Sequence, residues 1–184
     1  MTDITDPLYE RVLVLRCQAG DETAFAELVE RYQPRLRYYL RKMLRDLHGA
    51  EDALQEVWLD VFRAVSRLAD AGAFRSWIYR IARDRSLRVL RKCRLPHQPL
   101  EEVDEIVGQE EEAHFAAEDA ERIHGALDEL ATEHREVLVL RYVEDMTYEE
   151  IALVVGCRVG TVRSRLHYAK RALRVVLERM KVHD

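Results

Sequence analysis

Apolar residues recur at every third or fourth position along most of this chain, whereas the strict alternation that forms half-buried strands is nearly absent. Glycine and proline, which interrupt regular structure, number only seven and four. The pattern therefore predicts an all-α protein.

Near the start, Asp21 stands where a helix cap is expected, ahead of the apolar stripe Phe25, Leu28, Val29 and Tyr32. Pro34 either starts another helix or kinks this one, and the next stripe, from Leu36 to Leu44, stops where Gly49 breaks the pattern.

Two amphipathic segments follow. In residues 51–68 the apolar stripe predicts an inward face made of Leu54, Val57, Trp58, Val61, Phe62 and Val65. The other face is acidic and polar, with Glu51, Asp52, Gln55, Glu56 and Asp60. After a break at Ala71–Gly72, residues 74–92 combine the stripe Phe74, Trp77, Ile78, Ile81 and Ala82 with arginines on the remaining faces, namely Arg75, Arg80, Arg83, Arg85 and Arg88. Because Trp77 and Tyr79 lie two positions apart, they cannot share one helical face, so we expect at least one of them at an edge or exposed.

Residues 147–174 have the pattern of a helix-turn-helix. Thr147 and Glu150 fit a capping box at the start of the first helix, and Gly156 suits the left-handed residue that ends it. A second helix begins near residue 159 and carries the apolar stripe Val162, Leu166, Ala169 and Leu173. Its other positions are rich in arginine and lysine, a surface that suits the phosphates and major groove of DNA. The alternative is a solvated basic face on an ordinary helical hairpin.

The net charge of -5 conceals a strong segregation of charge. Residues 71–95 hold eight Lys or Arg against one Asp, residues 96–121 hold ten Asp or Glu and no Lys or Arg, and residues 156–184 hold eight Lys or Arg against two acids. Helical patterns resume near residue 116 and again near Thr132, and we expect these segments to pack under the helix-turn-helix. The sequence thus predicts two small helical domains, 1–95 and 116–184, joined by an acidic linker at 96–115.

Several classes of function are disfavoured by what the sequence lacks. It has no Gly-rich phosphate loop, no nucleophile elbow and no metal-ligand cluster, so we expect no catalytic residues, no cofactor and no metal. His114, His124 and His134 recur ten apart but fall on different predicted helices. Cys17, Cys93 and Cys157 form no paired motif and fit a reducing cytoplasm. No apolar run of about eighteen residues and no basic start followed by an apolar core is present, so neither a membrane span nor a secretory signal is expected.

Taken together, these segments resemble those of an extracytoplasmic-function (ECF) sigma factor, a compact branch of the sigma-70 family of bacterial RNA polymerase. Residues 24–44 resemble the opening helices of sigma region two, and residues 50–65 resemble its acidic core-binding helix. Residues 74–92 resemble the segment that opens and reads the minus-ten element of a promoter, and residues 126–174 resemble sigma region four. The four segments stand in the family's order, and the resemblance covers residues 21–174.

The resemblance implies a dissociable specificity subunit with three interfaces and no chemistry of its own. The first would dock on the coiled-coil of the largest subunit of core RNA polymerase through Asp52, Gln55, Glu56, Trp58, Leu59 and Asp60. The second would bind the minus-ten element through Arg75, Ser76, Trp77, Tyr79, Arg80, Arg83, Asp84 and Arg88. The third would bind the minus-thirty-five element through Arg158, Thr161, Arg163, Ser164, Arg165, His167, Lys170 and Arg171. Region four would also contact the polymerase flap, and an anti-sigma partner is common in the family.

Two residues depart from the family's pattern, and some alternatives stay open. Many relatives carry Asn where this chain has Asp84, and many carry Ser or Thr where Arg158 precedes the recognition helix. Trp77 is either a core residue or a platform for a melted base, and the acidic face at 51–60 is either solvated or a docking surface. Other interpretations of the chain are a stand-alone helix-turn-helix regulator and a sigma-like protein that titrates anti-sigma partners.

Overall fold

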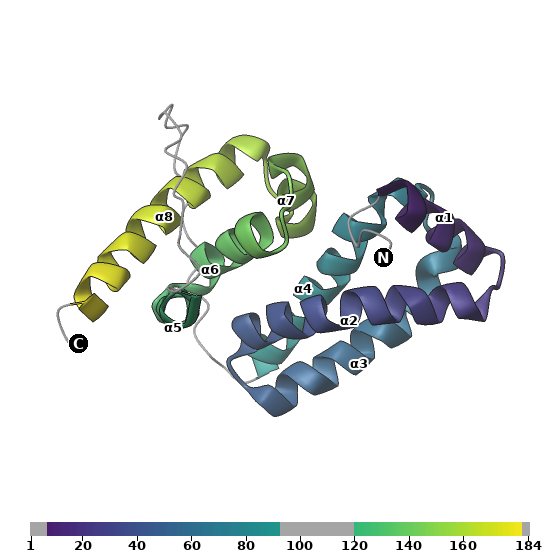
Figure 1. Cartoon of the computed structure of the whole chain (residues 1–184), viewed down its shortest axis with the longest axis horizontal. Coiled ribbons are helices and arrows are strands. Elements are labelled where there is room, and N and C mark those ends of the chain that lie inside the picture. Colours follow the sequence, from purple (N-terminus) through teal and green to yellow (C-terminus); the bar gives the residue numbers. More distant parts are fainter. Residues whose placement is uncertain (1–6, 93–119, 182–184) are drawn as a thin grey trace. The chain divides into compact units, whose positions relative to one another are not determined.

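The computed structural model describes residues 7–92 and 120–181, and every regular element in these two ranges is helical (Figure 1). The first range contains α1 (Pro7–Gln18), α2 (Glu22–Leu44), α3 (Leu47–Ala64), the 3-10 turns η1 (Val65–Arg67) and η2 (Ala71–Ala73), and α4 (Phe74–Lys92). The second contains α5 (Ala120–Glu129), α6 (Thr132–Leu138), the π-helical turn η4 (Val139–Val143), α7 (Tyr148–Val155) and α8 (Val159–Lys181). The chain divides into two compact units that follow these ranges, apart from Leu153–Val155. The prediction of an all-α, two-domain protein is thereby confirmed.

In the N-terminal unit, α2, α3 and α4 pack against one another and α1 packs against α2. The apolar stripe of α2 is buried, and its aromatic rings meet those of α4 edge to face. Tyr32 contacts Phe74 and Tyr39 contacts Tyr79, each with 5.4 Å between ring centroids. Such edge-to-face pairs add to the free energy gained by burying the rings themselves. The aromatic pairs therefore fix how α4 lies against α2.

Two aspartates cap the helices of this unit. Asp21 accepts hydrogen bonds from the backbone N–H groups of Thr23 and Ala24 at 2.9 and 3.2 Å, as its position predicts. Asp46 does the same at the start of α3, where it accepts from His48 and Gly49 at 3.2 and 2.9 Å. The expectation that Gly49 breaks the helical pattern is wrong, because Gly49 lies inside the first turn that Asp46 caps. Pro34 starts no new helix and lies within the continuous helix α2.

In the C-terminal unit, α8 packs along α5 and α6. The side chain of Arg135 on α6 is 1% exposed, and its Nη1 donates to the carbonyl oxygens of Asp128 and Leu130 at 3.3 and 3.5 Å. A buried guanidinium thus donates hydrogen bonds to carbonyl groups at the C-terminal end of α5 and directly after it. The predicted apolar stripe of α8, Val162, Leu166, Ala169 and Leu173, is buried as a whole.

The acidic linker predicted at 96–115 lies outside the described residues, as do Cys93 and His114. No helix within residues 7–92 and 120–181 combines the length and apolar character that crossing a membrane requires.

Candidate polymerase and promoter interfaces

The acidic face of α3 is exposed along one side of that helix. Asp52, Gln55, Glu56 and Leu59 follow one another at steps of three, one and three, so they share one face. All four are exposed, and Leu59 is exposed to 46%. This face therefore presents carboxylates around an exposed leucine, a composition that suits a partner with both basic and apolar groups.

Carboxylates along the edges of this face form ion pairs with arginines of the neighbouring helices α2 and α4. Glu51 accepts from Nε of Arg37 at 2.9 Å and from Nη2 of Arg41 at 3.0 Å, both on α2. The hydrogen bond from Arg37, supported by that from Arg41, lowers the pKa of Glu51 below its ordinary value. On the other side, Arg85 of α4 pairs with Glu56 and Asp60. Sequence patterns did not indicate these contacts, because the partners lie 10 to 29 residues apart.

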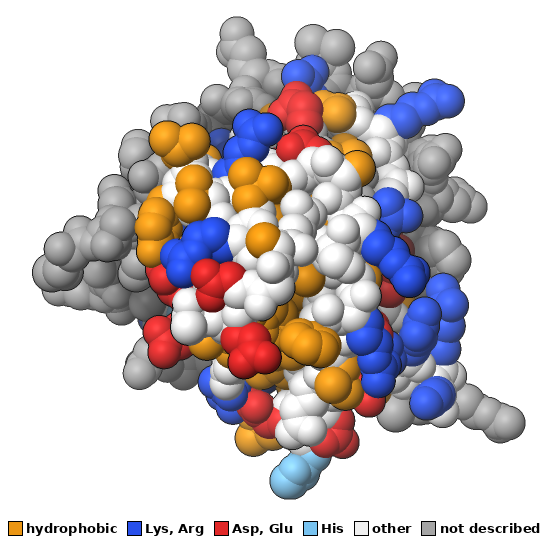
Figure 2. All heavy atoms as spheres, turned by 90° about the vertical axis from the view of Figure 1, so that its right-hand side faces the viewer, with side chains coloured by type: hydrophobic (Ala, Val, Ile, Leu, Met, Phe, Trp, Pro, Cys, Tyr) orange, Lys and Arg blue, Asp and Glu red, His pale blue; other side chains and the backbone are white. Residues whose placement is uncertain are grey.

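Beside the acidic face lies an aromatic group that the sequence placed inside. Phe62 is exposed to 64%, and its ring centroid lies 5.4 Å from that of Phe25. Trp58 is half-buried and meets the same Phe25 ring edge to face at 6.0 Å. The expectation of an inward Phe62 is wrong, because its ring covers α2 from the outside. Figure 2 shows hydrophobic side chains gathered on one face of the molecule with acidic side chains among them, and basic side chains along one edge of that view.

The basic surface of α4 is a row of residues one helical turn apart. Arg80, Asp84 and Arg88 are exposed and follow one another at four-residue spacing. Trp77, three positions before Arg80, is half-buried against Phe74, with 5.9 Å between ring centroids. Arg75 and Arg83 are also half-buried. Trp77 thus contacts the core while part of its surface stays accessible at the end of the row.

Two residues predicted to bind the minus-ten element are buried instead. Tyr79 is 0% exposed because its ring fills the space against Tyr39. Ser76 is 7% exposed, and its hydroxyl donates to the carbonyl oxygen of Ala73 at 3.0 Å. The phase of the helix directs both side chains into the unit, so in this conformation neither presents a surface to DNA and their contact with the minus-ten element stays a prediction.

Helix α8, the second helix of the helix-turn-helix, starts at Val159, directly after the exposed Arg158, and exposes a second basic surface. Arg163, His167 and Arg171 are exposed at successive four-residue steps, while Thr161, Arg165 and Lys170 are half-buried. Ser164 is 4% exposed, and its hydroxyl donates to the carbonyl oxygen of Thr161 at 3.0 Å. The hydroxyl proton is therefore used within the helix, and contact of Ser164 with DNA stays a prediction.

Helix α7 is held in the geometry that its sequence predicts. Glu150 N–H donates to Thr147 Oγ1 at 3.2 Å and Thr147 N–H donates to Glu150 Oε2 at 2.8 Å, which completes the capping box. Gly156 ends the helix with φ +70°, in the left-handed region, and its N–H donates to the carbonyl oxygen of Ala152 at 2.9 Å. Both ends of α7 are thus capped, and Gly156 begins the turn that leads to α8.

One contact of this surface involves residues that sequence analysis did not assign to it. The guanidinium carbons of Arg141 and Arg163 lie 5.4 and 6.0 Å from the ring centroid of Tyr148. Arg141 also donates from Nη1 to the carbonyl oxygen of Met146 at 2.9 Å. Tyr148 therefore joins α8 to η4 through cation–π contacts. The only signal in the sequence is an aromatic residue at the start of α7, which is too weak to predict them.

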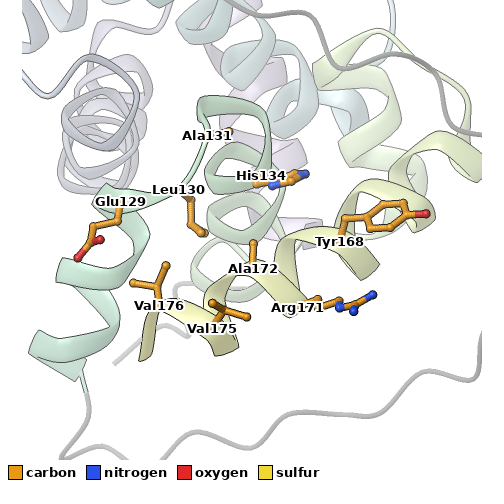
Figure 3. Close-up of a pocket in the computed structure, with 9 residues that line it drawn as sticks. All are labelled: Glu129, Leu130, Ala131, His134, Tyr168, Arg171, Ala172, Val175 and Val176. Carbon is orange, nitrogen blue, oxygen red and sulfur yellow. The ribbon is translucent and has the colours of Figure 1, made fainter. Parts of the chain in front are cut away.

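A groove of about 670 Å³ lies between α5, α6 and α8 in the C-terminal unit. Figure 3 shows its lining, which is mainly apolar: Leu130, Ala131, Ala172, Val175 and Val176, with Glu129, His134, Tyr168 and Arg171 at its polar positions. Burial lowers the pKa of His134 below its ordinary value, and the positive charge of Arg165 acts in the same direction. The groove is mainly apolar and suits an apolar helix of a partner.

Nothing in the described ranges brings three or more His, Cys, Asp or Glu side chains together as a metal site. The features that the two units do contain are surfaces: an acidic and apolar face on α3, basic faces on α4 and α8, and an apolar groove beside α8.

Comparison with known proteins gives one family-model match in the N-terminal unit and another in the C-terminal unit. The family model described as Sigma-70 region 2 matches residues 28–94, and that described as Sigma-70, region 4 matches residues 120–173. The chain is 32% identical over 181 residues to the RNA polymerase sigma-H factor of Pseudomonas aeruginosa, covering 92% of this chain and 94% of that protein. It is 30% identical over 184 residues to the ECF RNA polymerase sigma-E factor of Escherichia coli K12, covering 92% and 95%.

Among solved structures, the fold is similar to that of CnrH in complex with the cytosolic domain of CnrY. The TM-score is 0.69, the identity is 26%, and the match covers 94% of this chain and 98% of CnrH. The sigma factor RpoE of Bartonella quintana, solved with the anti-sigma factor NepR, shares the fold at a TM-score of 0.66 and 23% identity, covering 84% and 96%.

Proposed function

Because the chain belongs to the extracytoplasmic-function branch of the sigma-70 family of RNA polymerase sigma factors, we propose how its surfaces divide the work of promoter-specific initiation. The α3 face binds core RNA polymerase, the row on α4 binds the melted minus-ten element, and α8 binds the minus-thirty-five duplex. The observation that carries this division is the presence of two basic helical surfaces in separate units, together with an acidic and apolar face on a third helix.

On α3, carboxylates and an exposed leucine would meet basic and apolar groups of the polymerase coiled-coil. Charge complementarity of this kind speeds encounter and fixes register. Asp52 and Gln55 lie at the centre of the face, while Glu51, Glu56 and Asp60 are already paired within the chain. We assign the central contacts to Asp52, Gln55 and Leu59, and place Trp58 at the rim beside Phe62.

On α4, Arg80 and Arg88 would hold the phosphates of the melted strand, with Trp77 at the end of the row as a stacking surface. Stacking of a base on an aromatic side chain contributes about 1–3 kcal/mol. On α8, Arg163, His167 and Arg171 would face the major groove, with Lys170 and Arg158 beside them. The phosphate contacts would make binding strongly dependent on salt.

The groove beside α8 is the proposed site for the polymerase flap, since an apolar helix laid into an apolar groove is a common mode of recognition. The chain would act in the cytoplasm, where RNA polymerase works, and the linker at 96–115 would let the two units reach two promoter elements. An anti-sigma partner is also proposed, with support from the likeness to CnrH, which was solved in complex with the cytosolic domain of CnrY.

Run-off transcription with purified core polymerase on a genomic library tests the proposal. New start sites that depend on the chain are expected, and Asp52→Asn with Leu59→Ala should reduce both polymerase binding and transcript yield. A stand-alone helix-turn-helix regulator would bind DNA fragments without polymerase and would not respond to these two substitutions. A titrating protein would bind an anti-sigma partner and start no transcript.

A further inference from the structure

Arg85 reaches from α4 to two carboxylates of α3. Its Nη1 lies 2.9 Å from Oε2 of Glu56, and its Nε donates to Oδ2 of Asp60 at 2.7 Å. The Arg85 side chain is 22% exposed, against 29% for Asp60 and 52% for Glu56. One half-buried guanidinium therefore bridges two residues of the face proposed to bind polymerase.

The sequence of α3 explains why such a bridge matters. Asp52, Glu56 and Asp60 follow at four-residue spacing, so their negative charges lie one above another and repel. The planar fork of arginine can bond two carboxylates at once, which the single ammonium of lysine cannot do with the same geometry. Arg85 thus offsets the repulsion and restricts the rotamers of Glu56 and Asp60.

Pairing with Arg85 does not hide these carboxylates. The hydrogen bonds from Arg85 use Oε2 of Glu56 and Oδ2 of Asp60, while Oε1 and Oδ1 accept no bond from the described residues. Half of the Glu56 side chain stays accessible to solvent in the paired state. A partner can therefore bind the free oxygens while the guanidinium holds the other two in place.

We propose that Arg85 is a positioning residue for polymerase binding, which fixes Glu56 and Asp60 in the conformation that the core enzyme recognises. The inference rests on the proposed role of the α3 face. It also links the polymerase-binding helix directly to α4, the helix proposed to hold the melted strand. The opposite arrangement, in which Arg85 withholds these carboxylates from the polymerase, predicts tighter binding once Arg85 is removed.

The test is the dissociation rate of the full chain from core polymerase, measured with a fluorescent label after dilution into unlabelled chain. Side chains ordered in advance lose less freedom on binding, so Arg85→Ala should speed dissociation about fivefold to tenfold. Arg85→Lys keeps the charge without the fork and should fall between the wild type and Arg85→Ala. Arg67→Ala removes an equal charge from the exposed turn η1 and should leave the rate unchanged.

A double-mutant cycle separates positioning from a general structural effect. Glu56→Gln should speed dissociation in the wild-type background and have less than half of that effect, on a logarithmic scale, in the Arg85→Ala background. Additive effects, or an unchanged or slower dissociation of Arg85→Ala, would overturn the inference. Circular dichroism establishes that each variant is folded, and Arg85→Lys provides the answer should Arg85→Ala unfold.

The same experiment distinguishes this inference from the proposed function. Should the wild-type chain not bind core polymerase at all, the proposed function fails and the inference fails with it. Should the wild type bind, and Asp52→Asn weaken binding while the Arg85 variants do not, only the positioning role is rejected.

Discussion

The guanidinium of Arg163 lies over the ring of Tyr148, with its Cζ 6.0 Å from the ring centroid. Tyr148 is the first residue of α7 and Arg163 is an exposed residue of α8, so the contact joins the two helices of the helix-turn-helix. Arg141 lies 5.4 Å from the same ring. These contacts restrict both guanidinium groups, and under the proposed role of α8 they would reduce the conformational freedom lost when DNA binds.

We predict that Tyr148→Leu weakens promoter binding by the polymerase complex about two- to fivefold, since an exposed cation–π contact contributes about 0.5–1 kcal/mol. Fluorescence anisotropy on a promoter fragment mapped by run-off transcription measures the change. Tyr148→Phe keeps the ring and should retain most of the affinity. Equal losses in both variants would show that the hydroxyl, and not the ring, is what matters.

Asp84 lies between Arg80 and Arg88 on the exposed row of α4, one helical turn from each. A carboxylate at that position repels the phosphates that the two arginines would attract. We predict that Asp84→Asn strengthens binding of the polymerase complex to the melted minus-ten strand about threefold, an effect comparable to one exposed charge pair.

The measurement is binding to a promoter fragment with an unpaired minus-ten region, repeated at several salt concentrations. The Asp84→Asn complex should show the steeper dependence on salt. Glu30→Gln, which neutralises an exposed acid on α2, is the matched control and should bind as the wild type does. Weaker binding by Asp84→Asn would mean that this carboxylate contacts a base or holds an arginine in place.

The capping box at Thr147 allows a prediction on stability. Thr147→Ala removes the side-chain oxygen that accepts from Glu150 N–H, and loss of such a cap costs about 1 kcal/mol of unfolding free energy. Both tryptophans, Trp58 and Trp77, lie in the N-terminal unit. Urea unfolding followed by circular dichroism should therefore show the loss, while tryptophan fluorescence should not.

The neighbouring residue provides the control for that experiment. Glu149→Gln changes an exposed acid in the same turn and leaves the capping hydrogen bonds intact. Its unfolding midpoint should stay close to that of the wild type. A shift of equal size in the fluorescence transition of Thr147→Ala would mean that the two units unfold together.

Helices that have a single apolar face and a capping residue at one end could be predicted from the sequence with bounds close to those observed. The segment 74–92 coincides with α4, and Asp21, Thr147 and Gly156 cap helices as expected, because these signals are local. Helix α1 was not predicted. Its buried Leu13 and Val14 stand directly between the exposed apolar residues Val12 and Leu15, which are exposed to 43% and 51%, and Leu8 is exposed to 71%. Apolar residues therefore lie all around the helix and form no clear stripe.

At the candidate interfaces, less could be predicted from the sequence, because many contacts depend on tertiary structure. The acidic residues of α3 could be placed on one face from their spacing, but which of them are paired within the chain depends on α2 and α4. Ser76, Tyr79 and Ser164 were assigned to DNA by their position in a motif, whereas helical phase and local hydrogen bonds bury them. The contacts of Arg85 and Tyr148 could not be predicted from the sequence, because their partners are distant in the sequence or lie on another helix.

Asp21 makes the stability of the N-terminal unit depend on pH. The hydrogen bond from the Thr23 hydroxyl, followed by those from Arg16 and Ala24 N–H, lowers the pKa of the Asp21 carboxyl well below its ordinary value. A carboxyl whose pKa is lower in the folded state stabilises the fold above its unfolded pKa, which is about 3.9 for aspartate. That stabilisation is lost as the pH falls below about 4 toward the lowered folded value.

We therefore predict that the urea midpoint of the N-terminal unit, followed by tryptophan fluorescence, falls between about pH 4 and pH 2, and falls less steeply in Asp21→Asn than in the wild type. Asparagine can still cap α2 through its amide oxygen, but it has no proton to gain in this range. Glu22→Gln, at an exposed acid in the same turn, should keep the wild-type slope. Equal slopes in wild type and Asp21→Asn would place the acid sensitivity elsewhere, with Glu51 as the next carboxyl to test because its pKa is also lowered.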